Sequence, residues 1–169
     1  MADLQNNAIR SLSANRTVET LAGAAKFDSE GAFSGGGIAG DVDGTGTQAR
    51  FNMPTDLALD SKGRLFVADP LNNAIRIIAT NGTVTTWMRD RPDGRSYFRQ
   101  PTRIDIDAND NAYVLDVSDR KILRVTPQRK IVVLYEYSTE QLRDIAVDPR
   151  GTVYVTDGTR GRILKIEPR

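Results

Sequence analysis

The sequence contains no cysteine and no histidine. Without cysteine there is no disulfide, thiolate nucleophile or cysteine metal ligand, and the compartment stays open because reducing and oxidising environments both tolerate such a chain. Without histidine there is no Ser-His-Asp triad, no histidine general base and no histidine-bound zinc. The two absences favour a protein that is not an enzyme, with no catalytic residues, no cofactor and no metal site.

Long apolar runs and an excess of one charge are missing as well. The longest apolar stretch is Ile131–Tyr135, much shorter than the roughly 18 residues of a membrane-spanning helix. The N-terminus has no apolar signal-peptide core. The sum of Lys and Arg is 23 and that of Asp and Glu is 22, which leaves a formal charge of +1. We therefore expect a soluble chain with no membrane partner, and nucleic acid is not an expected partner.

What the sequence does contain is an internal repeat. Three segments align without a gap, at residues 54–69, 101–116 and 142–157. Each segment carries two aspartates nine residues apart: Asp60 and Asp69, Asp107 and Asp116, Asp148 and Asp157. An isoleucine lies six residues after the second aspartate in all three copies, and Asp3 with Ile9 marks a partial fourth copy. A period of about 40 to 50 residues is typical of repeat architectures.

Within each repeat the pattern is that of β-strands. Apolar residues alternate with polar or small ones, as at Leu57 and Leu59. The segments 61–63, 108–110 and 149–151 hold residues that favour tight hairpins. No segment keeps the 3.6-residue period of a helix. The sequence therefore predicts an all-β protein made of four-stranded antiparallel propeller blades, because radial packing of such blades leaves few open edges.

Residues 50–76 resemble an NHL repeat. The resemblance rests on Pro54 before the first strand, the turn Asp60-x-x-Gly63, the strand end Phe66-Val-Ala-Asp69 and the third strand Asn73-Ala-Ile-Arg76. Residues 40–51 resemble the segment that joins blades in bacterial NHL proteins. The resemblance implies a β-propeller. Some NHL propellers bind RNA, and similar propellers include lyases and lactonases with a metal in the central channel, so both are alternative functions.

The domain organisation is expected to be one propeller segment over residues 1–169. Residues 1–23 supply strands three and four of a blade, 50–88 and 97–137 are whole blades, and 140–169 supply strands one to three. This amounts to about three blades, half of a six-bladed propeller, whereas closed rings have about four to eight. We therefore expect a homodimer that closes a six-bladed ring, with strand 17–21 pairing beyond the C-terminal strands of the neighbour. A truncated or engineered propeller segment without a ligand is the alternative.

The favoured function is a non-catalytic binding or scaffold module for a protein or a small ligand. Its site would lie on the loop face, the end of the blades that carries the blade-joining segments and the loops after the repeated aspartates. The candidate ligand-binding residues are Asn72, Asn73, Arg95 and Tyr97. Arginines and aromatics interleave in residues 89–99, which is the basis of the RNA alternative.

Three further motifs have structural interpretations. Residues 41–47 resemble the start of an EF-hand loop, but Asn52 stands where the bidentate Glu is required, so we expect turn-forming aspartates in place of a calcium site. The aspartate that ends the second strand recurs in every blade, and a hydrogen bond that fixes a turn is needed in each blade, whereas a catalytic group is needed once. Arg10 and Arg76 are expected on the strand surface.

Overall fold

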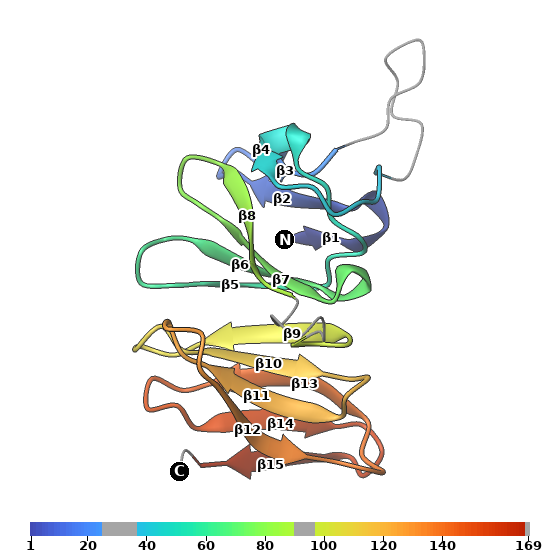
Figure 1. Ribbon diagram of the computed structural model, residues 1–169, viewed down its shortest axis with the longest axis vertical. Coiled ribbons are helices and arrows are strands. Elements are labelled where there is room, and N and C mark those ends of the chain that lie inside the picture. The colour runs from blue at the N-terminus through green and yellow to red at the C-terminus, as the bar shows by residue number, and fades with distance from the viewer. Residues whose placement is uncertain (25–36, 90–96, 168–169) are drawn as a thin grey trace.

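The computed structural model describes residues 1–24, 37–89 and 97–167. Within these ranges the chain forms four antiparallel sheets that follow one another along the molecule (Figure 1). Sheet 1 contains β1 (Ala2–Asp3), β2 (Ala8–Leu12) and β3 (Val18–Ala22). Sheet 2 contains β4 (Gly44–Thr45), β5 (Asp56–Leu59), β6 (Leu65–Asp69), β7 (Ala74–Ile78) and β8 (Thr83–Met88). Sheet 3 contains β9 (Pro101–Ile106), β10 (Ala112–Asp116), β11 (Lys121–Val125) and β12 (Ile131–Glu136). Sheet 4 contains β13 (Leu142–Val147), β14 (Val153–Asp157) and β15 (Arg162–Ile166).

In the part of the chain that the structure describes, turns and three 3-10 helices connect the strands. These helices are η1 (Leu4–Asn6), η2 (Gly46–Gln48) and η3 (Pro70–Asn72). No helix in the described ranges is long and apolar enough to cross a membrane. The fold is all-β, as the sequence predicts. Sheets 1, 3 and 4 are antiparallel meanders, and sheet 2 is the meander β5 to β8 with β4 added beside β8.

The arrangement at the two ends differs from the strand count made on the sequence. The two ends form the separate three-stranded sheets 1 and 4, so the N-terminal end has three strands where the sequence predicted two. The expected strand at 17–21 is β3, which pairs with β2 in its own sheet. The sequence did not predict β4, which adds a fifth strand to sheet 2 beside β8.

Each hairpin between the first two strands of a blade is built on an aspartate. Asp60 accepts hydrogen bonds at its Oδ1 atom from the backbone N–H groups of Lys62 and Arg64, at 3.0 and 2.8 Å. The same pair of bonds recurs at Asp107 and at Asp148. The third turn residue takes a positive φ in all three copies: Gly63, Asp110 and Gly151. The predicted hairpins are therefore confirmed. Each is stabilised by a carboxylate that accepts hydrogen bonds from backbone N–H groups of the turn.

Apolar side chains between consecutive sheets form three cores. We call the face that a sheet turns toward the next sheet its leading face and the opposite one its trailing face. Between sheets 2 and 3, Phe66 and Ile75 of the leading face pack in one cluster with Val114 and Leu123 of the trailing face. Sheets 1 and 2 meet in the same way around Ile9 and Val67, and sheets 3 and 4 around Tyr113, Ile122 and Val153. A phenylalanine of the blade-joining segment completes the first two cores: Phe51 and Phe98.

Among the innermost strands, β9 contacts both β5 and β13, and side chains cap backbone N–H groups of β9 and β13. Asp56 accepts the N–H of Ile104 at 2.9 Å, and Asp105 accepts the N–H of Val147 at 2.7 Å. An edge strand with unpaired N–H groups is open to unwanted pairing. The carboxylate of one blade thus protects the inner edge of the next.

We expect the blade cores to carry much of the stability. Ile75→Ala removes a fully buried side chain from the core between sheets 2 and 3 and should lower the free energy of unfolding by about 2–5 kcal/mol. Leu71→Ala, four residues away on an exposed position, should change it by no more than about 0.5 kcal/mol. Urea unfolding followed by circular dichroism measures both values. Equal losses from the two variants would contradict the assignment of this core.

Candidate functional site

The loop face is held in place by the aspartate that ends the second strand of each blade. Asp69 is fully buried. It accepts the N–H of Asn52 at 2.8 Å, the side-chain amide of Asn72 at 2.8 Å and the guanidinium of Arg76 at 3.1 Å. Burial raises its pKa despite these donors. The bond to Asn52 ties the blade-joining segment to the middle of its own blade.

The same use of the aspartate recurs in the later blades. Asp116 accepts the N–H groups of Arg99, Gln100 and Asp119, and Asp157 accepts the N–H of Thr159. These bonds confirm the turn-fixing role that the repetition predicts. A carboxylate with this many backbone donors orders the loop beside it.

Arg76 is buried, so its expected place on the strand surface is wrong. Its guanidinium lies 2.7 Å from Asp43, 3.1 Å from Asp69 and 3.4 Å from Asp41. It also donates to the backbone oxygens of Val42 and Arg50, both at 3.0 Å, and stacks over the Phe51 ring at 5.4 Å. The physical reason is that the joining segment 40–51 folds across the trailing face of β7 and covers the side chain.

Arg10 occupies the same repeat position in sheet 1 and is partly covered. Its Nε atom lies 3.0 Å from Asp3, the aspartate that ends β1. The equivalent positions in sheets 3 and 4 are the apolar Leu123 and Leu164, both of which pack in blade cores. The buried arginine is therefore a feature of one type of blade.

In the segment that resembles an EF-hand loop, the carboxylates form ion pairs with arginines of the same chain. Asp43 binds Arg76 and accepts the N–H of Thr86 at 3.1 Å, while Asp41 pairs with Arg76 and Arg89. Burial alone would raise the pKa of Asp43, but the Thr86 N–H and the Arg76 guanidinium together lower it. Over the described residues, no group of three or more Asp and Glu is arranged to hold a metal ion.

The structure places three of the four predicted site residues near the segments that join the blades. Asn72 donates its amide to the Gly40 carbonyl at 2.7 Å as well as to Asp69. Asn73 has a left-handed φ of 51°, and its carboxamide lies against the carbonyl oxygen of Arg99. Tyr97 is partly buried and packs against the core between sheets 2 and 3. Arg95 lies outside the described residues. A ligand role for these residues stays a prediction.

The loop face of sheets 3 and 4 contains a hollow that the sequence did not predict. It has a volume of about 270 Å³ and lies between the loop after β10 and the segment that joins β12 to β13. Its lining residues are Val117, Arg120, Tyr137, Glu140, Gln141, Leu142 and Arg143. We call it the loop-face cavity. Arg120 donates to the Ser138 carbonyl at 3.0 Å, and Arg143 donates to the Gln141 side chain at 3.1 Å.

Glu140 organises one wall of the loop-face cavity. It accepts a hydrogen bond from Arg160 at 2.8 Å and from the N–H groups of Ser138 and Thr139. The Arg160 guanidinium, followed by the backbone donors, lowers the pKa of Glu140 to about 2. Burial, with the Asp116 charge adding to it, raises the pKa of Tyr137 to about 12. At neutral pH the wall therefore holds one charged carboxylate and one neutral phenol.

Arginine is concentrated around this cavity. Arg120 and Arg143 line it, and Arg160 and Arg162 contact Glu140 of its wall. Arg99, in the segment before β9, lies 3.8 Å from Asp119 of the loop after β10. Arg120 stands at the repeat position of Asn73, and Arg160 stands at that of Asn72. The later repeats lack the pair Asn72-Asn73, and this difference was the sequence signal that could have identified the two arginines. It does not reveal a cluster by itself, because these arginines come from several separate segments.

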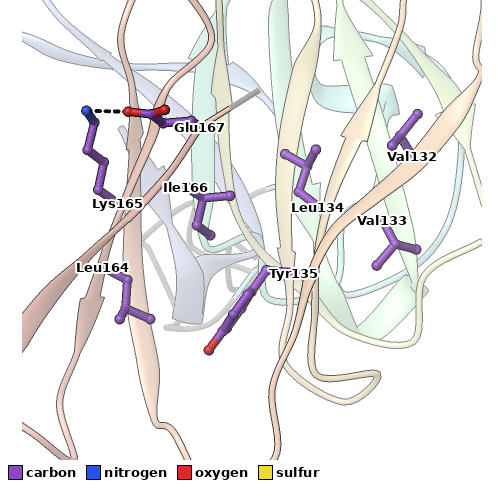
Figure 2. A pocket seen from close by; sticks show the side chains of 8 residues that line it. All are labelled: Val132, Val133, Leu134, Tyr135, Leu164, Lys165, Ile166 and Glu167. Atoms are coloured by element: carbon purple, nitrogen blue, oxygen red, sulfur yellow. Dashed lines mark hydrogen bonds and ion pairs between the residues drawn. The ribbon is translucent and has the colours of Figure 1, made fainter. Parts of the chain in front are cut away.

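A larger groove of about 560 Å³ runs between the outer strand β12 and the last strand β15. Figure 2 shows the β12 side chains Leu134 and Tyr135 on one side and Leu164 and Ile166 of β15 on the other. Lys165 and Glu167 form an ion pair of 2.7 Å at its margin. Among the described strands β15 pairs with β14 alone, so its outer backbone edge is open along this groove.

Comparison with known proteins agrees with this architecture. Residues 51–78 match the NHL repeat family, which confirms the resemblance seen in the sequence. A virginiamycin B lyase from Staphylococcus aureus superposes with a TM-score of 0.54 at 15% identity, over 99% of this chain and 65% of the lyase. No curated protein matches the chain significantly.

Two further solved structures share the arrangement. An auxiliary nutrient binding protein from Bacteroides thetaiotaomicron has a TM-score of 0.56 at 20% identity, over 77% of this chain and 33% of that protein. A gluconolactonase from Xanthomonas campestris has a TM-score of 0.51 at 17% identity, over 64% and 36%. The chain thus spans less than two thirds of each of these three proteins. At such identities the likeness shows the propeller-type fold alone.

The buried arginine leads to a test of stability. Arg76→Met leaves the buried Asp69 without its cation and should lower the free energy of unfolding by about 3–5 kcal/mol. Leu123→Met introduces the same residue at the same repeat position of sheet 3, where an apolar residue already stands. It should cost less than about 1.5 kcal/mol. Urea unfolding of the two variants compares them, and similar costs would show that the Arg76 cluster contributes little.

Glu140 should make stability depend on pH in the acidic range. Its folded pKa of about 2 lies below the ordinary value of 4.5, so its charged form stabilises the fold above pH 4.5 and this contribution disappears as the pH falls toward 2. We expect the urea midpoint of the natural chain to exceed that of Glu140→Gln near pH 7 and to converge with it near pH 2. Glu136→Gln is the matched control, because its exposed carboxylate lies 3.6 Å from Lys121 and such surface pairs contribute little. A constant difference at all pH values would contradict this role.

Proposed function

We propose that the chain is a non-catalytic binding module that recognises an acidic segment of a protein partner through the loop-face cavity. The observation that carries the proposal is the group of arginines around a hollow on a chain whose formal charge is only +1. Arginine and tyrosine are the side chains that dominate many binding hot spots. Both line this cavity.

The frame around the cavity supports this function. The backbone of the loops on both sides is fixed by Asp116 and Asp157, so the arginines project from ordered supports. Ordered loops lose little conformational entropy on binding. Glu140 neutralises Arg160 locally, whereas Arg120 and Arg143 are paired with uncharged acceptors. These two guanidinium groups are therefore the ones we assign to an incoming carboxylate.

The choice of a protein partner over RNA rests on the aromatic content of the site. Recognition of single-stranded RNA depends on aromatic rings on which bases stack. Tyr137 is the one aromatic residue among those that line the cavity, and part of its ring packs against the core between sheets 3 and 4. A carboxylate is bound by hydrogen-bond donors such as guanidinium groups and does not require aromatic stacking. The lining of the cavity therefore favours an acidic peptide.

The fold does not choose between catalysis and binding. The neighbours with this architecture include a lyase and a gluconolactonase as well as a nutrient binding protein. Function depends on the site that a fold carries. The absence of histidine and cysteine from the sequence and the arginine-lined cavity together favour binding.

The proposal is tested with a short fluorescent glutamate-rich peptide as the probe. The natural chain should bind it in a fluorescence anisotropy titration, and affinity should fall as salt increases because the contacts are electrostatic. Arg120→Glu and Arg143→Glu should each weaken binding by about tenfold or more, since each variant places a like charge in the cavity. Arg129→Glu makes the same charge change in the exposed turn between β11 and β12 and should leave binding unchanged.

Two outcomes would overturn the proposal. One is the absence of peptide binding at low salt. The other is an equal loss of affinity in all three variants, which would indicate a general charge effect. A single-stranded RNA of similar length serves as the second ligand, and tighter binding of this RNA that depends on Arg120 would favour the RNA alternative.

A further inference from the structure

The leading face of sheet 4 exposes side chains that the other sheets bury. Tyr154 stands at the repeat position of Phe66 and Tyr113, and Ile163 stands at that of Ile75 and Ile122. All four equivalents in sheets 2 and 3 are buried in blade cores. In sheet 4 the exposed fraction is 39% for Tyr154 and 68% for Ile163. The sequence therefore places blade-core residues on a face that nothing in the described chain covers.

The trailing face of sheet 1 shows the complementary exposure. Leu12 stands at the repeat position of Ile78, and its cross-strand neighbour Val18 stands at that of Val84. Ile78 and Val84 are buried in the core between sheets 1 and 2. The exposed fractions are 64% for Leu12 and 53% for Val18. Sheet 1 thus also presents core residues to solvent, on the opposite kind of face.

The two uncovered faces are of the kinds that pack together elsewhere in the chain. All three cores between the described sheets join a leading face to a trailing face. Sheets 1 and 4 lie at opposite ends of the molecule (Figure 1), so one copy does not bring its own two faces into contact. A second copy supplies both missing partners.

We infer that the leading face of sheet 4 packs on the trailing face of sheet 1 of a second copy, around Tyr154 and Ile163 on one side and Leu12 and Val18 on the other. The contact is heterologous, because the two surfaces are different. Two such contacts close a ring of two chains. The inference is independent of the ligand proposed for the loop face.

Packing of faces continues an arrangement that the chain already has, in contrast to the strand addition expected from the sequence. Addition of β3 to the open edge of β15 would merge two three-stranded sheets into one extended sheet. Face packing keeps each sheet separate, as it does for the consecutive sheets within the chain. Two copies then bring eight sheets, counting four in each, which is within the usual range of propellers.

The oligomeric state tests this inference. In light scattering over a dilution series, the natural chain should have twice its mass of 18.6 kDa. Ile163→Lys and Leu12→Lys should each be monomeric, because every contact needs one intact face of each kind. An equimolar mixture of the two variants should regain the dimer mass, since one intact leading face and one intact trailing face remain. This dimer should dissociate at higher concentrations than the natural one because it has a single contact.

The controls separate this inference from a loss of folding and from the proposed function. Leu71→Lys changes an exposed apolar residue of the loop face and should keep the dimer mass, as should Arg120→Glu. Far-ultraviolet circular dichroism checks that each variant is folded, and Val18→Lys replaces Leu12→Lys if the latter is not. A natural chain that stays monomeric at all concentrations, or a mixture of folded variants that does not associate, would overturn the inference.

Discussion

The packing of one sheet face on the next is the interaction on which the rest of this structure depends. Strands β7 and β10 are buried along their whole length, because each lies in a sheet with a neighbour on both sides. Burial of apolar side chains is the main favourable term in folding, and a single sheet of four strands cannot bury both of its faces alone. Every copy of the repeat supplies a leading face and a trailing face. The loops and the blade-joining segments connect the sheets so that these faces pack against each other.

The polar side chains solve the problems that this packing creates. Stacking the sheets buries the strand ends and the starts of the inner strands, and backbone groups buried there need partners. Asp69 and Asp116 supply them at the loop face, while Asp56 and Asp105 do so at the inner edges. The cost of burying these carboxylates is visible in the raised pKa of Asp69. Arg76 offsets this cost in sheet 2 and also binds the joining segment through Asp43.

Because buried aspartates fix the backbone of the loop face, the exposed side chains on this face can differ from one repeat to the next. The repeat position occupied by Asn73 is occupied by Arg120 in sheet 3, and both take the same left-handed backbone conformation. The backbone role is therefore conserved within the chain while the side chain changes from a structural amide to an exposed charge. This separation of frame and surface is the physical basis for placing a binding function on the loop face of sheets 3 and 4.

Much of the fold could be predicted from the sequence, and less of the site. Contacts between residues close in sequence determine the order of strands, the hairpins at Asp60 and Asp107 and the turn-fixing aspartates. Because these contacts recur in every repeat, the sequence pattern predicts them. The loop-face cavity depends on residues from separate loops, so its arginines do not form a motif along the chain. Asn72 and Asn73 were placed on the correct end of the blade, but the structure uses their amides within the chain.

The sequence by itself determined that this protein repeats a β-meander, because strand periodicity and turn chemistry are local. Only the tertiary structure decided which equivalent positions are covered. Ile75 and Ile163 are the same residue at the same repeat position, yet one is buried and the other is exposed. Likewise, Arg76 is buried because residues far away in the sequence fold over it. Burial depends on the neighbours that a side chain acquires in space, and a repeat cannot specify a neighbour that lies beyond its last sheet.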